Sequence, residues 1–297
     1  MKILVIGASG MIGKPVTIEL AKAGYELTLL SRNPHQMRQL YPKMKIVEGD
    51  VLDQVSLMHA MEGQDAVYIS MQAPRGALQS HPQPEREGID NIIDAATYGG
   101  IKRIVYLSSL VQNYNGMNGF HWWVFDMKQS AVEKIKSCGI PYTIFYASAL
   151  MENLDQFLMK GNKILLAGVS KTPMYFIAGE DYGRQVGWSF RIPATENKEY
   201  VAQGLEAFTW DEAAKVFINN YSKSRLRIVK APMKVLKLAG MLNSKSYYGY
   251  KIVTALNNYP EKFEAEQTWS ELGKPSITLA AYAQMRSNIT SPPALAK

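Results

Sequence analysis

The feature that most constrains this chain is a glycine-rich segment, GASGMIG, at residues 7–13. It follows KILVI, which has the apolar run of a buried strand, and precedes a segment whose apolar residues are spaced for one helical face. Here Gly7 permits a tight turn, Gly10 lets the backbone approach a pyrophosphate, and Gly13 lets the helix pack closely on the sheet. The helix N-terminus offers free N–H groups and a positive dipole end to phosphates. The segment predicts a dinucleotide site, the alternative being a glycine-rich turn without a ligand.

Strand and helix patterns alternate through the first 150 residues. Apolar runs predict six strands, at residues 2–6, 26–32, 44–50, 65–70, 102–109 and 141–148. Amphipathic segments between them predict helices at residues 16–25, 33–41, 53–62, 86–100 and 126–139. Apolar strands that alternate with helices are typical of a parallel sheet covered on both faces. We therefore expect an α/β fold, a Rossmann-type doubly wound parallel sheet, with residues 1–150 as its nucleotide-binding core.

The alternation breaks down after residue 150. Short strands are expected at residues 163–168, 174–179 and 198–204, and helices at residues 209–221, 232–242 and 247–259. Thr209 and Glu212 have the spacing of a capping box, which supports the first of these helices. We expect residues 151–297 to form a smaller, mostly substrate-binding C-terminal lobe, interleaved with the core.

Composition excludes several classes of protein. The 297 residues are 47% hydrophobic and 20% charged, which is ordinary globular composition. The single cysteine, Cys138, excludes an internal disulfide framework and a cysteine-rich metal site, and we expect no metal. No apolar run approaches the ~20 residues of a membrane span, and the first residues lack a signal-peptide pattern. A cytoplasmic protein is therefore expected.

Positive charge is concentrated in one block. Residues 213–260 contain nine lysines and arginines and no Asp or Glu, whereas the whole chain carries +7. The block is either a solvated basic face or a surface for an anionic ligand, a protein partner or a membrane. Nucleic acid is not expected, because no zinc-finger, RRM or KH signature is present.

The end of the second predicted strand bears on which dinucleotide binds. An Asp or Glu usually holds the ribose 2′-hydroxyl of NAD at this point, but no acidic residue follows Leu30. Ser31 and Arg32 stand there instead, a hydroxyl and a guanidinium that suit a 2′-phosphate. NADP(H) is therefore favoured over NAD(H), unless Arg32 is only a surface residue at a strand end.

The glycine spacing G-x-x-G-x-x-G, with later segments, resembles the short-chain dehydrogenase/reductase superfamily. More narrowly, it resembles the atypical branch of NmrA-like proteins and NAD(P)H-dependent quinone or dye reductases. The segments that carry the resemblance span most of the chain: LLSRNP (29–34), EGDVLD (48–53), SCGIPYTIFYASALMENL (137–154), FIAGEDYGRQV (176–186) and LEAFTWDEAA (205–214). In one departure, the family's Arg-Pro after the sixth strand is Tyr146-Ala147 here.

The resemblance implies roles at the carboxyl ends of the strands, where open parallel sheets bind ligands. Asp50 would accept a hydrogen bond from the adenine amino group, and Val51 would lie against the ring. The other residues expected at the cofactor are Gly7, Ser9, Gly10, Met11, Ile12, Gly13, Ser31, Arg32, Ser70, Met71, Gln72, Ser108, Lys128 and Tyr146.

The stretch HWWVFDMK, residues 121–128, contains the expected catalytic lysine. Most enzymes of the superfamily combine a Ser with a Tyr and a Lys spaced Y-x-x-x-K, and the Tyr passes a proton to the substrate. Ser109 and Lys128 match this arrangement by resemblance, but Val124 stands where the Tyr is expected. Lys128 would then act mainly on the cofactor, by holding its ribose.

The missing tyrosine leaves the proton donor open. Tyr114 and His121 are the best substitutes in the loop before Lys128, and Tyr146 is another candidate. Quinone-like or dye-like acceptors can also take their proton from water. The aromatic residues before Lys128 either pack on the core or form a pocket wall over the nicotinamide.

These observations predict an NADP(H)-binding oxidoreductase that transfers hydride to a small quinone-like or aromatic acceptor. The alternative is a non-catalytic NADP(H) sensor that acts on a protein partner through the basic C-terminal lobe. A sugar-nucleotide epimerase or dehydratase is disfavoured, because such enzymes keep the Y-x-x-x-K pair. A monomer is expected.

Overall fold

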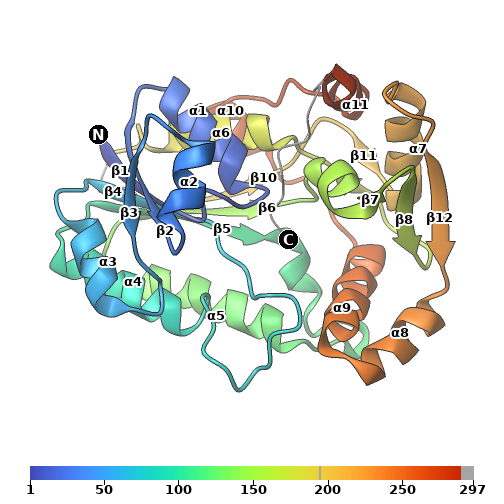
Figure 1. The fold of residues 1–297 in the computed structure, drawn as a ribbon, viewed down its shortest axis with the longest axis horizontal. Coiled ribbons are helices and arrows are strands. Elements are labelled where there is room, and N and C mark those ends of the chain that lie inside the picture. The colour runs from blue at the N-terminus through green and yellow to red at the C-terminus, as the bar shows by residue number, and fades with distance from the viewer. Residues whose placement is uncertain (194, 289–297) are drawn as a thin grey trace.

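The computed structural model describes residues 1–193 and 195–288, so the last part of the predicted lobe, residues 289–297, lies outside the described residues. A seven-stranded parallel sheet forms the centre, in the order β10-β6-β5-β4-β1-β2-β3 (Figure 1). Its strands are β1 (Lys2–Ile6), β2 (Glu26–Ser31), β3 (Lys45–Glu48), β4 (Ala66–Ile69), β5 (Arg103–Ser109), β6 (Tyr142–Ala147) and β10 (Lys198–Ala202). All six strands predicted before residue 150 are present.

Helices cover both faces of the sheet, which confirms the doubly wound Rossmann-type fold. Alternate residues of β1 serve the two faces: Ile3 and Val5 join one apolar cluster, and Leu4 and Ile6 join another. The first face is covered by α1 (Gly13–Lys22), α6 (Gly179–Ser189) and α10 (Glu266–Leu272), and the second by α3 (Gln54–Met61), α4 (Glu87–Tyr98) and α5 (Trp123–Ser137). A shorter helix, α2 (Pro34–Leu40), lies between β2 and β3 in the chain.

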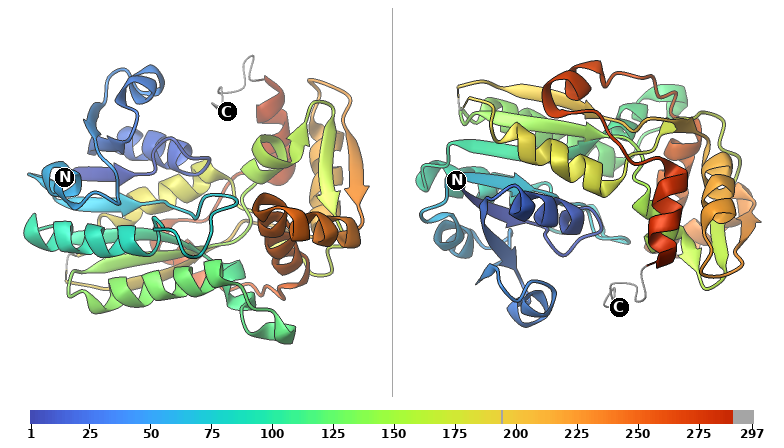
Figure 2. Two further views of the ribbon diagram at one scale, coloured as in Figure 1. Left: turned by 60° about the horizontal axis from the view of Figure 1, so that its bottom comes forward. Right: turned by 90° about the horizontal axis from the view of Figure 1, so that it is seen from above.

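The chain after residue 150 contributes to both halves of the molecule. The segment expected as a short strand at residues 198–204 is β10, which pairs in parallel with β6 and extends the main sheet. Among the described residues, the separate lobe contains two small sheets, four α-helices and a short π-helix, Asn153–Leu158, and Figure 2 shows it beside the main sheet. Its elements are β7 (Met159–Lys160), β8 (Lys163–Ala167), β9 (Met174–Tyr175), β11 (Ala207–Phe208), β12 (Arg227–Ala231), α7 (Trp210–Asn220), α8 (Met233–Leu242), α9 (Ser244–Asn258) and α11 (Leu279–Asn288).

Helix boundaries follow the predicted caps at some ends and differ at others. Thr209 caps α7 in a complete capping box with Glu212, as predicted. Helix α5 begins at Trp123, three residues before its expected start, so part of the aromatic run is helical and not loop. No side chain caps this end of α5, and the local sequence therefore carried no start signal.

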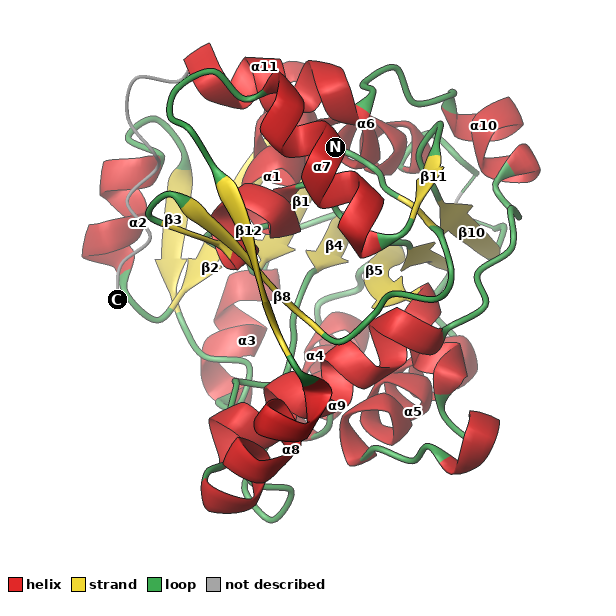
Figure 3. Ribbon diagram, turned by 90° about the vertical axis from the view of Figure 1, so that its right-hand side faces the viewer, coloured by secondary structure: helices red, strands yellow, loops and turns green. Residues whose placement is uncertain are grey.

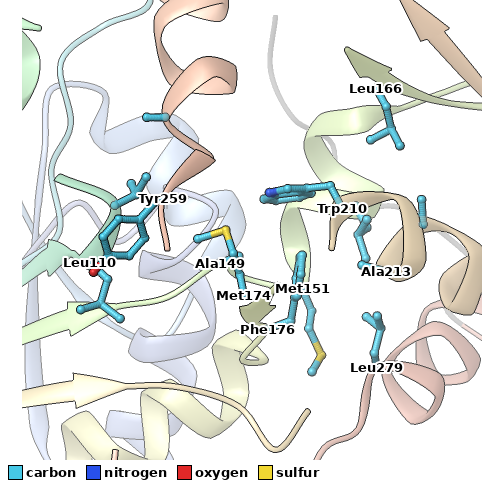
Figure 4. Packing of buried hydrophobic residues seen from close by; sticks show 14 of the residues in the cluster. Leu110, Ala149, Met151, Leu166, Met174, Phe176, Trp210, Ala213, Tyr259 and Leu279 are labelled. Carbon is cyan, nitrogen blue, oxygen red and sulfur yellow. The ribbon is translucent and has the colours of Figure 1, made fainter. Parts of the chain in front are cut away.

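A large apolar cluster joins the two halves (Figure 4). It combines Leu110 and Phe125 from the sheet half with Trp210 and Tyr259 from the lobe. Phe176 and Trp210 meet edge to face, with ring centroids 4.8 Å apart. The shared cluster fixes the lobe against the carboxyl ends of the strands, which point toward it (Figure 1).

Candidate cofactor and active site

The glycine loop between β1 and α1 is packed closely against neighbouring backbone. Gly7 has φ +93°, and a Cβ there would lie 2.0 Å from the Ser70 carbonyl oxygen. A Cβ on Gly13 would lie 1.9 Å from the Gly7 carbonyl oxygen. Both contacts are with backbone atoms, which cannot move aside as a side chain can, so glycine is required at both positions. The loop is thereby held against the end of β4.

The end of the loop presents backbone to solvent at the start of α1. Ser9 and Gly10 are exposed, and Met11 and Ile12 are half-buried. Neither a side-chain cap nor an acidic residue occupies the first turn of α1. In the first turn of α1, Lys14 N–H already donates to the Gly10 carbonyl at 3.0 Å and Pro15 has no N–H. The N–H groups of Met11, Ile12 and Gly13, where the loop enters the helix, are therefore the ones that suit a phosphate.

Arg32 is positioned at the end of β2 as expected for a phosphate ligand. Its side chain is 80% exposed, and one guanidinium nitrogen lies 3.9 Å from Asp50, which is too long for a firm pair. Ser31 Oγ accepts from the Asn33 N–H at 3.1 Å, which leaves its own hydrogen available as a donor. Asp50 Oδ1 accepts from the Leu52 N–H at 3.0 Å, within the turn after β3.

The other residues expected at the cofactor differ in how accessible they are. Gln72 is exposed, Ser70 and Met71 are half-buried, and all three directly follow β4. Val51 is buried and packs on Gly88 of α4, and Ser108 is buried and donates to Gln112 Oε1. The structure therefore places Val51 and Ser108 in packing contacts, whereas Ser70 to Gln72 stay open to a ligand.

Lys128 is held by a buried carboxylate that the sequence analysis missed. Its Nζ donates to Glu85 Oε1 at 2.5 Å, with 14% of the Lys128 side chain and 0% of the Glu85 side chain exposed. Glu85 also accepts from the Tyr106 hydroxyl at 3.1 Å and from the Ala73 N–H at 3.1 Å. Lys128 is therefore not a solvated lysine, and its positive charge compensates the negative charge of the buried Glu85 carboxylate.

The three candidate proton donors lie in different environments. Tyr114 is buried in the apolar cluster, and its hydroxyl accepts from Asn118 at 3.5 Å. His121 is 74% exposed and lies 3.1 Å from Asp126. The Tyr146 hydroxyl donates to Glu199 at 2.6 Å, and burial, reinforced by Glu199, raises the pKa of Tyr146 well above its usual value. Each of these groups therefore has a polar partner other than Lys128.

The aromatic run before Lys128 is packing, not an open pocket wall. Phe120 is 9% exposed, and Trp122 and Phe125 are each 2% exposed. Trp122 meets Phe125 and, from α9, Tyr248 edge to face at 5.0 Å and 4.9 Å. These contacts tie the start of α5 to the lobe. Only Trp123 is half-buried.

A pocket of about 360 Å³ lies beside β6 and β10. Among the predicted site residues Tyr146 lines it, together with three carboxylates, Glu133, Glu199 and Glu264. Carboxylates repel phosphate groups, so we assign the nucleotide site from the glycine loop and not from this pocket.

A second buried acid, Glu152, lies between the N-terminal ends of α1 and α6. Its Oε1 accepts from the Gly179 N–H at 2.9 Å, and a Cβ on Gly179 would lie 2.6 Å from Pro15 of α1. Its Oε2 is buried without a hydrogen-bond partner. Burial raises the pKa of Glu152 to about 7. The sequence segment MEN at residues 151–153 carried this residue, but nothing local predicted its burial.

Within the described residues, no cluster of His, Cys, Asp or Glu has the makings of a metal site. No helix in residues 1–193 or 195–288 is long and apolar enough to cross a membrane.

The fold and the glycine loop define a Rossmann-type protein of the dinucleotide-binding class. Comparison with known proteins identifies the group within this class: the NmrA-like family model matches residues 1–287, so the chain belongs to the NmrA-like family.

Relatives within and around this family have diverse names. A photosystem II assembly factor, Ycf39, of Trieres chinensis is 23% identical over 85% of this chain and 79% of its own length. A (4-alkanoyl-5-oxo-2,5-dihydrofuran-3-yl)methyl phosphate reductase of Streptomyces griseus is 23% identical over 70% of this chain and 69% of its own.

Solved structures share the fold at low identity. The Escherichia coli NADPH-dependent quinone oxidoreductase QOR2, complexed with NADPH, has a TM-score of 0.70, 20% identity, and coverage of 96% of this chain and 100% of its own. The Citrobacter sp. triphenylmethane reductase, complexed with NADP(H), has a TM-score of 0.72, 17% identity, and coverage of 97% and 100%.

The Lys128–Glu85 pair predicts a specific pattern of stability. Lys128→Met is expected to lower the free energy of unfolding by about 3–5 kcal/mol, because Glu85 keeps an uncompensated buried charge. Adding Glu85→Gln is expected to restore most of that loss, since an amide retains an acceptor for Ala73 and offers a donor to Tyr106. Denaturant unfolding measures both variants.

Lys134→Met is the matched control for this prediction. Lys134 lies on the same helix and pairs at 2.7 Å with Asp90, which is 51% exposed. Its loss is expected to change the free energy of unfolding by at most about 1 kcal/mol. A double variant no more stable than Lys128→Met would contradict the assigned cause.

Glu152 predicts a pH dependence of stability. Its pKa is about 7 in the folded protein against 4.5 for an exposed carboxyl, so between these values the folded state keeps a proton that the unfolded state has lost. This contribution is therefore complete below pH 4.5 and is lost as pH rises toward 7, by about 3 kcal/mol in all. Glu152→Gln is expected to remove that loss, so wild type should weaken relative to the variant between pH 5 and pH 8. Glu133→Gln, at a 76% exposed carboxylate, is the control, and parallel curves for wild type and Glu152→Gln would refute the prediction.

Proposed function

We propose that this chain binds NADP(H) and transfers hydride to a small quinone-like or aromatic acceptor. The observation that carries the proposal is the glycine loop, where Gly7 and Gly13 bring backbone together at an uncapped helix N-terminus. The names of the E. coli and Citrobacter proteins, both in complex with NADP(H), support it by analogy.

The residues of this chain divide the work of binding between two ends. The first turn of α1 would hold the pyrophosphate, and Ser31 and Arg32 would hold the 2′-phosphate by charge-assisted hydrogen bonds. Lys128 and Ser109 lie toward the reacting end, at the start of α5 and the end of β5. NADPH, when bound, supplies the hydride.

Proton supply limits the acceptors that fit. The position one helical turn before Lys128 is Val124, which is 2% exposed. Tyr114, His121 and Tyr146 are each engaged by a partner other than Lys128. An acceptor that takes its proton from water needs none of them, which favours quinones and dyes over ketones.

The second candidate is a sensor that binds NADP(H) without turnover. It is favoured by Val124, which stands where a tyrosine would precede Lys128 by one helical turn, together with the engagement of Lys128 by Glu85. The relative named as an assembly factor is consistent with such a role.

One experiment separates the two candidates. The full chain is titrated with NADPH and NADP⁺ by fluorescence, and NADPH absorbance is then followed with a panel of quinones and triphenylmethane dyes. Acceptor-dependent loss of absorbance is the result expected of a reductase. Tight binding of both redox forms without turnover would assign the sensor, and no binding of either would refute both candidates. Turnover is probed with Lys128→Arg, which keeps a positive charge opposite Glu85, because Lys128→Met is expected to lower stability.

Arg32→Ala tests the choice of cofactor. Loss of a charge-assisted contact worth about 1.5–3 kcal/mol is expected to weaken NADPH binding by roughly 10-fold to 150-fold. NADH lacks the 2′-phosphate, so its affinity is expected to change by less than about twofold. Binding titrations of both dinucleotides measure the difference.

Lys102→Ala is the matched control for Arg32→Ala. Lys102 is also an exposed cation 3.9 Å from an aspartate, Asp65, but it precedes β5 and so lies at the amino ends of the parallel strands, whereas Arg32 follows the carboxyl end of β2. It is expected to leave both affinities unchanged. Equal losses of NADPH and NADH binding in Arg32→Ala would argue against NADP(H) specificity.

A further inference from the structure

Helix α8 exposes an apolar stripe that no other part of the described chain covers. None of its residues is buried. Leu242 and Met241 are 85% and 76% exposed, the highest values among the large apolar side chains of the described residues. Leu238 and Val235 are 64% and 57% exposed. We call these four residues the α8 stripe.

The stripe is one face of a helix whose other face is already used. Val235, Leu238 and Leu242 are spaced i, i+3 and i+7, which places them on one side. The opposite side packs on α9, where a Cβ on Gly240 would lie 3.0 Å from Tyr247 Cα. The orientation of α8 is therefore fixed by its contact with α9, and the stripe is directed away from the molecule.

Positive charge borders the stripe. Lys234 and Lys237 are exposed on α8, and Lys245 follows on α9. The block from residue 213 to 260, which includes both helices, has nine basic residues and no acidic one. The surface thus combines exposed apolar side chains with lysines whose long stems can lie along apolar material.

The neighbouring small sheet has the same character. Leu165 of β8 and Val229 of β12 are partners in the parallel register and are 40% and 39% exposed. Arg227 lies two residues before Val229 on the same face of the strand. Strands β8 and β12 lie on the same side of the molecule as α8 (Figure 3).

We propose that α8 is a docking helix for an anionic lipid surface, on which the α8 stripe enters the headgroup region and the lysines contact acidic headgroups. Exposed apolar side chains bordered by lysines are typical of a helix that lies in such an interface. A second copy of the chain is a poorer occupant, because a two-fold contact between stripes would bring the lysines of both copies close together without acidic partners on α8. The proposal is independent of turnover at the nucleotide site.

Vesicle sedimentation of the full chain tests the proposal. We expect binding to vesicles of phosphatidylcholine with phosphatidylglycerol, weak binding to phosphatidylcholine alone, and weaker binding at high salt. Each lysine near an anionic surface contributes about fivefold in affinity, so Lys234→Glu/Lys237→Glu is expected to weaken binding at least ~25-fold. Leu238→Ser/Leu242→Ser is expected to weaken binding at least ~10-fold.

Matched controls alter the same residue types elsewhere. Ile18→Ser/Val55→Ser removes apolar side chains that are 46% and 63% exposed on α1 and α3. Lys43→Glu/Lys45→Glu reverses two exposed lysines at the start of β3. Neither control is expected to change vesicle binding by more than about twofold, because single exposed side chains on separate elements do not form a docking surface. Circular dichroism checks that each variant is folded.

A tryptophan at the stripe reports insertion directly. The emission of Leu238→Trp is expected to shift to shorter wavelength when anionic vesicles are added. Absence of anionic vesicle binding, equal binding to neutral vesicles, or insensitivity to the stripe variant would overturn the proposal. A dimer that Leu238→Ser/Leu242→Ser abolishes, without vesicle binding, would assign the stripe to a second copy instead.

Discussion

The site depends on the buried carboxylate of Glu85. It accepts from the loop after β4 through Ala73, from β5 through Tyr106, and from α5 through Lys128, so one side chain joins three segments at the carboxyl edge of the sheet. A charge with no exposed surface requires a compensating charge close by, which fixes the Lys128 ammonium group to one position. The place of Lys128 relative to the glycine loop therefore follows from an electrostatic requirement, not from the helix alone.

This arrangement limits the chemistry that the edge can support. Burial together with Glu85 raises the pKa of Tyr106 well above its usual value, and burial first and Glu85 next raise the pKa of Tyr248 to about 12. The two tyrosines near this carboxylate, Tyr106 and Tyr248, are thus weaker acids than an exposed tyrosine. Glu85 thus engages the lysine and raises the pKa of the tyrosines near it. At this edge, the pKa of each tyrosine that Glu85 influences is therefore raised and not lowered.

Local patterns predicted much of the fold and little of the packing at the site. The six strands, the turn of the glycine loop and the Thr209 capping box depend on short segments, and the sequence therefore contains them directly. Glu85 stands in a proline-rich loop 43 residues before Lys128, so its burial is a tertiary result that no local pattern signals. The same holds for β10, which lies far from β6 in the chain yet pairs with it in parallel. The early start of α5 has no local sequence signal, because the N-cap residue Trp122 has no capping side chain.

The aromatic run HWWVFDMK packs against helix α9. On α9, Tyr248 packs on Trp122, which directly precedes α5, and Lys251 donates to the His121 carbonyl at 2.6 Å. The residue before Tyr248, Tyr247, packs on Gly240 of α8. The aromatic residues thus form the surface on which the helix pair α8–α9 packs, and they directly adjoin α5, which carries Lys128. Packed interiors transmit displacement because they contain few voids. A contact that holds α8 therefore also restrains α9 and, through Trp122, the start of α5, which makes the orientation of the lobe and the position of Lys128 parts of one packed unit.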